Sequence, residues 1–280
     1  MTYWDARSSL DRLPQGRTEE QLDRLWADAR LLLVDEAGQL AADGDRPRWV
    51  PASGQRRPDD VLLGSAGGAV YFARLVPELD GQRMGMRECP PEWLHLVANA
   101  SALMNWHRTQ PRCDYCGAVT MVDEGGLRRL CPECGSLAFA RQDPAIIVAV
   151  LDEADRLLLG RQVTWAPGRC SVLAGFVEAG ESAEQACHRE IYEEAQLRLN
   201  GVRYVSSQPW PYPRSLMLGF VAWAESGDPV VDGIEMAEAS YLSRQELTSA
   251  VDEGRLKLPG GASIARQLIN SWLRGDLPSR

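Results

Sequence analysis

The stretch Leu173–Leu197 reads LAGFVEAGESAEQACHREIYEEAQL and carries the clearest structural signal in the chain. Ser182, followed three residues later by Gln185, forms a capping box, so a helix is predicted over residues 182–195. Apolar side chains recur along this helix at the spacing of one buried face: Ala183, Ala186, Cys187, Ile191 and Ala195. The stretch therefore predicts an amphipathic helix that packs on a hydrophobic core.

Three glutamates share another face of the same helix. Glu190, Glu193 and Glu194 stand at positions i, i+3 and i+4, where side chains on a helix are neighbours. Their like charges repel one another unless a cation lies between them, and carboxylate oxygens on a rigid helix suit Mg2+ or Mn2+. On these three residues alone, a solvated acidic face explains the pattern equally well.

The wider pattern distinguishes between these two interpretations. Gly175, Glu181, Arg189, the three glutamates and Leu197 follow the order and spacing G-x5-E-x7-R-E-U-x-E-E-x-G-U, which resembles the Nudix box of hydrolases that cleave nucleoside-diphosphate-linked substrates. One position departs, because Gln196 stands where the box has a glycine at the helix end. We expect either a left-handed Gln196, at a cost of roughly 1 kcal/mol, or a slightly longer helix.

Hydrophobic runs on both sides of this helix predict strands, and the C-terminal part predicts a final helix. The strands are expected at residues 145–151, 157–159, 203–206 and 216–223, and the helix at 262–273. Strands that alternate with helices favour an α/β/α sandwich. We therefore expect a Nudix α/β/α sandwich over residues 142–280, in a chain of mixed α+β and α/β class.

Four of the seven cysteines form two Cys-x-x-Cys pairs separated by 14 residues: Cys113, Cys116, Cys131 and Cys134. Two such pairs can complete a tetrahedral all-sulfur Zn2+ site, which is structural because no coordination position stays open. Two redox dithiols are the alternative, but neither pair opens a thioredoxin-like unit. Residues 111–141 are therefore predicted to be a zinc ribbon. The remaining Cys89, Cys170 and Cys187 are interpreted as buried apolar residues rather than reactive thiols.

The first 110 residues predict a separate N-terminal α+β domain. A helix is expected over residues 18–30 with Thr18 as its N-cap, and a second over residues 92–106. Strands are expected at 31–34, 61–63 and 69–72. Residues 43–60, rich in Gly, Pro and Arg, predict a mobile loop.

A second motif follows the box, because residues 207–217 read SQPWPYPRSLM. Three prolines among aromatic residues favour a stiff wall whose flat faces stack a planar ring, with Gln208 and Ser215 available to its edges. A proline-rich surface loop is the alternative. The motif resembles the S-Q-P-W-P-F-P-x-S signature of the NADH pyrophosphatase branch of Nudix hydrolases, with Tyr212 for the usual Phe. That branch also carries a zinc ribbon before its Nudix domain, and some members remove NAD caps from RNA.

The resemblance implies roles for individual residues. The metal ligands would be Glu190, Glu194, the backbone carbonyl of Ala174 and a distal glutamate, for which Glu235 is the best match and Glu238 the next. Glu193 would be a further ligand or the base that activates water. Arg189 would orient Glu190.

The resemblance also implies substrate contacts. They would come from the second motif, from the last helix and from an aromatic residue after the ribbon: Gln208, Pro209, Trp210, Pro211, Tyr212, Pro213, Arg214, Ser215, Ala265 and Phe139. Family members have a glutamate contact inside the ribbon loop that falls on Gly126 here, so this contact is in doubt.

The charge balance limits the partners. Thirty Lys and Arg against 39 Asp and Glu give a net charge of −9, which provides no general drive toward nucleic acid. Five arginines could still line a path for RNA: Arg112, Arg128, Arg129, Arg141 and Arg214. No apolar run is long enough to cross a bilayer, and residues 1–7 lack the pattern of a signal peptide, so we expect a cytoplasmic protein without membrane contact.

The function implied by the resemblance is hydrolysis of the diphosphate bond of NAD(H), with Mg2+ or Mn2+, to AMP and nicotinamide mononucleotide. NAD-capped RNA is a second candidate substrate. A homodimer is expected by analogy. The alternative is a nucleotide sensor of Nudix fold that binds without cleaving, although such proteins usually lack the glutamates that are present here.

Overall fold

The computed structural model describes residues 8–15, 17–231 and 233–280, and the chain divides into two compact units. The N-terminal unit extends to Gln142 and includes the short segment Trp210–Arg214. The C-terminal unit comprises Asp143–Pro209 and Ser215–Arg280. The division at residue 142 lies next to the boundary expected for the Nudix domain, whereas the ribbon and the N-terminal domain form one unit.

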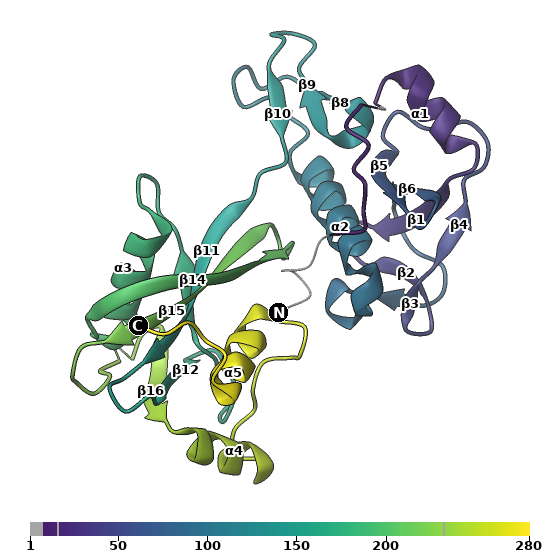
Figure 1. Cartoon of the computed structure of the whole chain (residues 1–280). Helices are drawn as coiled ribbons and strands as arrows, with labels where there is room; N and C mark the ends of the chain where they lie inside the picture. The colour runs from purple at the N-terminus through teal and green to yellow at the C-terminus, as the bar shows by residue number, and fades with distance from the viewer. Residues whose placement is uncertain (1–7, 16, 232) are drawn as a thin grey trace. The chain divides into compact units, whose positions relative to one another are not determined.

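A mixed six-stranded sheet forms the centre of the C-terminal unit, in the order β14-β15-β11-β12-β16 with β13 paired to β11 (Figure 1). The long strand β11 pairs in parallel with β15 and antiparallel with β12 and β13. The strands are β11 Asp143–Leu151, β12 Leu157–Gln162, β13 Leu173–Phe176, β14 Leu199–Trp210, β15 Ser215–Ala224 and β16 Met236–Leu242.

Helices cover both faces of this sheet. Side chains of β11 alternate between the faces, so that Val148 packs with α3 (Ala183–Ala195), while Ala149 packs with α4 (Arg244–Asp252) and α5 (Ile264–Arg274). The predicted α/β/α sandwich is confirmed. Sequence patterns missed β13, β16 and α4.

Among its described residues, the N-terminal unit contains a seven-stranded sheet and two α-helices. Helix α1 (Glu19–Trp26) begins at the predicted Thr18 cap but ends earlier than expected, and α2 spans Leu94–Thr109 after the 3-10 turn η3 (Pro91–Trp93). The strands are β1 Arg30–Asp35, β2 Leu40–Asp43, β3 Arg46–Pro47, β4 Trp49–Pro51, β5 Val61–Ala66, β6 Ala69–Val76 and β7 Arg83–Met84. The loop predicted over residues 43–60 therefore holds two short strands, because β3 pairs with β2 and β4 pairs with β1.

The ribbon is a three-stranded sheet of β8 (Met121–Asp123), β9 (Arg128–Leu130) and β10 (Leu137–Phe139), with the 3-10 turn η4 (Glu124–Gly126) between β8 and β9. Gly126, with φ of 88°, packs so closely on Val61 that a Cβ would come within 2.6 Å of that side chain. The position on which the resemblance places a glutamate contact therefore has no room for a side chain without a shift of Val61.

A buried arginine joins the ribbon to α2. Arg129 donates to Thr120 Oγ1 at 2.6 Å and to Nδ1 of His107 at 3.0 Å, and His107 Nε2 lies 2.9 Å from the carbonyl oxygen of Gly126. Burial lowers the pKa of His107 to about 4, so the ring is neutral at pH 7 and donates from Nε2. Arg129 is therefore a buried structural residue. It is not available to contact RNA, contrary to the expectation that it lines a path for RNA.

No helix among the described residues combines the length and the hydrophobicity needed to cross a membrane. The longest, α2, has 16 residues. Residues 1–7, on which the expectation of no signal peptide rests, lie outside the described residues.

Candidate active site and metal centre

The capping box predicted from the sequence starts helix α3. Gln185 N donates to Ser182 Oγ at 3.2 Å, and Ser182 N donates to Gln185 Oε1 at 2.9 Å. The helix ends at Gln196, whose φ of 54° is left-handed, which is one of the two outcomes expected for the missing glycine. Both helix ends are thus fixed by local contacts, and the glutamates between them are held on a rigid support.

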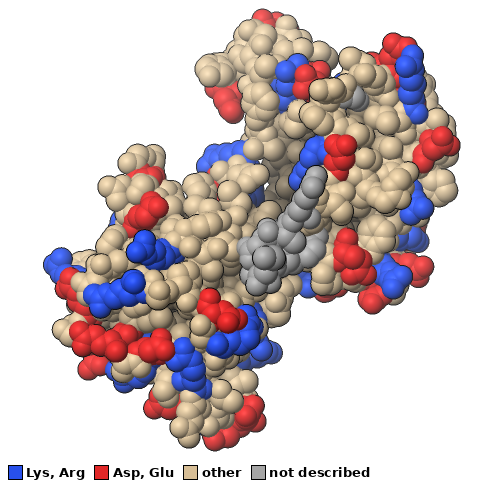
Figure 2. All heavy atoms as spheres, in the orientation of Figure 1, with Lys and Arg blue, Asp and Glu red and all other residues tan. Residues whose placement is uncertain are grey.

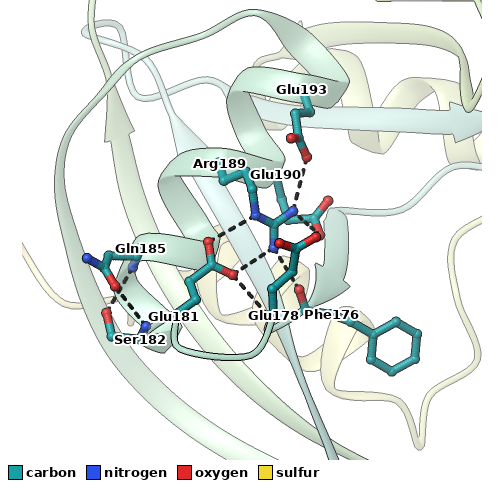
Figure 3. A network of polar contacts seen from close by, with 8 residues as sticks. All are labelled: Phe176, Glu178, Glu181, Ser182, Gln185, Arg189, Glu190 and Glu193. Atoms are coloured by element: carbon teal, nitrogen blue, oxygen red, sulfur yellow. Dashed lines mark hydrogen bonds and ion pairs between the residues drawn. The ribbon is translucent and has the colours of Figure 1, made fainter.

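Arg189 lies at the centre of the polar network on this helix (Figure 3). Its Nε and Nη2 donate to the two oxygens of Glu181 at 2.9 and 2.8 Å. Its Nη1 donates to Glu190 Oε1 at 2.9 Å and to Glu193 Oε2 at 3.0 Å, and Nη2 also donates to the carbonyl of Phe176 at 2.8 Å. The bonds raise the pKa of Arg189 and lower that of Glu181. One guanidinium therefore orients three of the four box glutamates, Glu181, Glu190 and Glu193, and ties the helix to β13 through the carbonyl of Phe176.

Glu190 is pressed against the backbone of β13. A Cβ built on Gly175 would lie 1.9 Å from the carboxyl carbon of Glu190, so only glycine leaves room for this carboxylate. Burial raises the pKa of Glu190, Arg189 opposes that shift, and the charges of Glu193 and Glu235 add to it. Negative charge is thus concentrated around Glu190, where a cation would relieve it.

Glu235 rather than Glu238 contributes to this concentration of charge. Glu235 precedes β16 and acts electrostatically on Glu190, whereas Glu238 is held by Arg161 Nη2 at 2.6 Å. Glu194 is 5% exposed, and Ala174 pairs with Ile147 of β11. The structure thus brings Glu193 and Glu235 within electrostatic range of Glu190, and the resemblance places a divalent cation beside them.

The expected substrate residues of the C-terminal unit are largely buried. Gln208 is 2% exposed, and its amide donates to the carbonyl of Ala262 and accepts from Ile264 N, both at 2.7 Å. Ser215 and Ala265 are also buried, with Ala265 in the core under α5. In this structure, Gln208 joins the end of β14 to the start of α5, and its amide oxygen is already engaged by the backbone.

The aromatic residues of the second motif belong to the N-terminal unit. Trp210 is half-buried and Pro211 buried, whereas Tyr212 and Pro213 are exposed, with a cis peptide bond between them. On the ribbon, Phe139 is 61% exposed. Next to the box, the sequence patterns did not single out the ring of Phe176, which is 56% exposed and points away from the Arg189 network (Figure 3). The position of Phe176 directly after Gly175 of the box could have indicated from the sequence that this ring lies near the site.

The four ribbon cysteines converge as their spacing predicts. Their sulfur atoms all lie within 4.8 Å of one another, with Cys113 and Cys134 at 3.6 Å and Cys116 and Cys131 at 3.4 Å. Tetrahedral Zn–S bonds of about 2.3 Å require similar sulfur separations. Each pair is followed by a glycine in the left-handed conformation, Gly117 or Gly135, which closes the turn. The four sulfurs could therefore hold one metal ion, which is consistent with a zinc ribbon.

The other three cysteines are buried and unreactive. Burial raises the pKa of Cys89 and Cys187 to about 12 and that of Cys170 to about 11. A thiol with so high a pKa carries almost no thiolate at pH 7, which confirms the interpretation of these residues as apolar packing.

Comparison with known proteins agrees with the box. A family model of the NUDIX domain matches residues 141–261. The chain is 38% identical over 296 residues to the NAD-capped RNA hydrolase NudC of Mycobacterium bovis (strain BCG / Pasteur 1173P2), covering 95% of this chain and 93% of the relative. It is 38% identical over 191 residues to human NAD-capped RNA hydrolase NUDT12, covering 64% of this chain and 41% of the relative. A match over nearly the whole length of NudC, with the box residues in place on α3, shows that the chain belongs to the Nudix hydrolase family.

Proposed function

We propose that this enzyme hydrolyses the diphosphate bond of NAD(H) to AMP and nicotinamide mononucleotide. The observation that carries the proposal is the network on α3, in which Arg189 holds Glu190 against Gly175 and beside Glu193. The similarity to NudC and NUDT12, whose names describe hydrolases of NAD-capped RNA, supports an NAD-containing substrate.

The side chains around Glu190 suit Mg2+ or Mn2+. Hard oxygen donors and excess negative charge favour such an ion, and Glu190, Glu194, Glu235 and the carbonyl of Ala174 would hold it, with Glu193 as a further ligand or as the base. The ion would supply Lewis acidity toward the diphosphate and lower the pKa of the attacking water. Arg189 keeps Glu190 and Glu193 oriented, and one carboxylate accepts the proton of water.

We further propose that the second motif recognises the dinucleotide. Trp210 and Tyr212 offer ring faces for stacking, with Pro209, Pro211, Pro213 and Arg214 shaping the segment and Phe139 as an additional ring. Gln208, Ser215 and Ala265 act from buried positions that fix the surrounding backbone. We also propose that the protein is a homodimer. We place it in the cytoplasm, a reducing compartment, because the four ribbon cysteines are free thiols that can bind zinc there.

NAD-capped RNA is the second candidate substrate. Of the five arginines expected to guide RNA, Arg129 is buried and Arg128 is paired with Asp123 at 2.6 Å. On the face of the C-terminal unit seen in Figure 2, positive and negative side chains alternate without a continuous positive stripe. We therefore expect free NAD(H) to be cleaved with little dependence on salt, and capped RNA to be bound through few phosphates.

A substrate comparison tests the proposal. NADH, NAD+, ADP-ribose, diadenosine tetraphosphate and an NAD-capped RNA are supplied with Mg2+ or Mn2+, and kcat/KM is measured at two salt concentrations. The proposal predicts that NAD(H) or the capped RNA has the highest kcat/KM. Preference for ADP-ribose or diadenosine tetraphosphate would contradict it. Binding of NADH without cleavage would favour the nucleotide sensor.

The ribbon gives a separate prediction about zinc. We expect one Zn2+ per chain. The ion should be lost in Cys131→Ser and kept in Cys89→Ala, because Cys131 is one of the four clustered cysteines and Cys89 is not. Structural zinc of this kind contributes on the order of 10 kcal/mol to the folding of its module, so Cys131→Ser also unfolds the ribbon. Metal analysis by mass spectrometry measures the stoichiometry, and an unchanged zinc content in Cys131→Ser would refute the assignment.

A further inference from the structure

The segment Trp210–Arg214 is held by the N-terminal unit, although it lies in the sequence between two strands of the C-terminal sheet. Among the described residues of the N-terminal unit, Met86, Arg87 and Asn105 contact it. Met86 and Arg87 belong to the 3-10 turn η2 (Met86–Glu88), and Asn105 belongs to α2.

Each of these residues makes a defined contact. Met86 N donates to the hydroxyl oxygen of Tyr212 at 2.8 Å, and Asn105 Nδ2 donates to the carbonyl of Pro213 at 2.7 Å. The guanidinium of Arg87 lies over the rings of Trp210 and Tyr212, 4.8 and 5.0 Å from their centroids. The segment is thus held at the carbonyl of Pro213, at the hydroxyl of Tyr212 and by the contact of Arg87 with the two aromatic rings.

The hydroxyl of Tyr212 fills a particular need of η2. The first N–H groups of a helical turn have no partner within the turn, and Met86 is the first residue of η2. The side chain of Met86 is buried, so this N–H has little access to water. Gly85, directly before it, leaves space for the tyrosine, because a Cβ there would already lie 3.3 Å from the hydroxyl oxygen. Phenylalanine, the usual residue of the family signature at this position, would leave the Met86 N–H without this acceptor.

We propose that the N-terminal unit positions the segment Trp210–Arg214, with Tyr212 as the positioning residue through its hydroxyl and Asn105 as a second anchor. The inference rests on the proposed function in one respect: the segment must contact the dinucleotide for its position to matter in binding. In this proposal, the N-terminal unit holds Trp210 and Tyr212 in place, so that a planar ring of the dinucleotide can stack on them. Ordering before binding lowers the entropy cost of binding and therefore lowers KM.

The test uses Tyr212→Phe and Asn105→Asp in the full chain. Tyr212→Phe removes only the hydroxyl, and Asn105→Asp replaces the donor to Pro213 while keeping an acceptor for Arg108. We expect KM for NADH to rise about five-fold in each, the scale of one lost hydrogen bond, with kcat within two-fold of the wild type. Amide hydrogen exchange of peptides spanning residues 208–217 should accelerate. Tyr204→Phe, at an exposed tyrosine of β14, is the matched control and should change neither quantity.

The outcomes separate this inference from the proposed function. Unchanged exchange and unchanged KM in both variants would overturn the positioning role. A fall in kcat that tracks a lower melting temperature, with KM constant, would also overturn it, because it indicates general destabilisation. If the wild type cleaves no dinucleotide, the proposed function fails, and the exchange measurement alone then supports or overturns the anchoring of the segment.

Discussion

Replacement of Glu194 by Gln is expected to lower kcat for NAD(H) hydrolysis by about 10³-fold, the scale of a lost metal ligand or catalytic base. Glu194 lies on α3 four residues after Glu190 and is only 5% exposed, so bulk water does not replace its charge. Gln keeps the size of the side chain and removes the negative charge. Steady-state kinetics with saturating Mn2+ measure the effect.

The matched control for this variant is Glu184→Gln. Glu184 is exposed in the first turn of the same helix, so its replacement changes net charge equally but leaves the site intact. We expect its kcat within two-fold of the wild type. Equal kcat in Glu194→Gln and Glu184→Gln would show that the carboxylate of Glu194 is not needed for catalysis.

Gly175→Ala is the second variant with a large expected effect. The added Cβ would lie 1.9 Å from the carboxyl carbon of Glu190 and 2.0 Å from its nearer oxygen, so the carboxylate must move. A displacement of about 1 Å at a reacting group can cost on the order of 10²-fold in rate, and we expect kcat/KM to fall at least that far. The fold persists, because the clash is with the end of a flexible side chain.

Gly201→Ala is the control for the added methyl group. A Cβ on Gly201 would meet only the ring of Trp223 at 3.7 Å, which is ordinary contact. Kinetics and thermal melting of the two variants are measured side by side. Wild-type kcat/KM in Gly175→Ala would mean that Glu190 is not needed where the structure places it.

Local patterns predicted the parts of this protein that depend on local physics. The capping box at Ser182 fixed the start of α3, and the spacing of Cys113, Cys116, Cys131 and Cys134 predicted their convergence. The left-handed Gln196 was also foreseen as one of two outcomes, because helix ends favour that conformation.

Contacts between distant residues could not be predicted in the same way. The side-chain amide of Gln208 bonds to the backbone of Ala262 and Ile264, more than 50 residues away, and no local pattern marks these partners. The bond between Met86 and Tyr212 joins residues 126 positions apart, and no periodicity marks either. The strands within residues 43–60 depend on pairing partners in β1 and β2, which outweighs the local preference of Gly and Pro for loops.

Identification of the products formed from NADH tests the proposed chemistry most directly. The protein is incubated with NADH and Mn2+, with NADH and a chelator, and as Glu194→Gln, and the products are separated by chromatography. We predict equal amounts of AMP and reduced nicotinamide mononucleotide, formed only by the wild type with metal. Products of glycosidic cleavage, or no product from NADH with either Mg2+ or Mn2+, would contradict diphosphate hydrolysis at the α3 carboxylates.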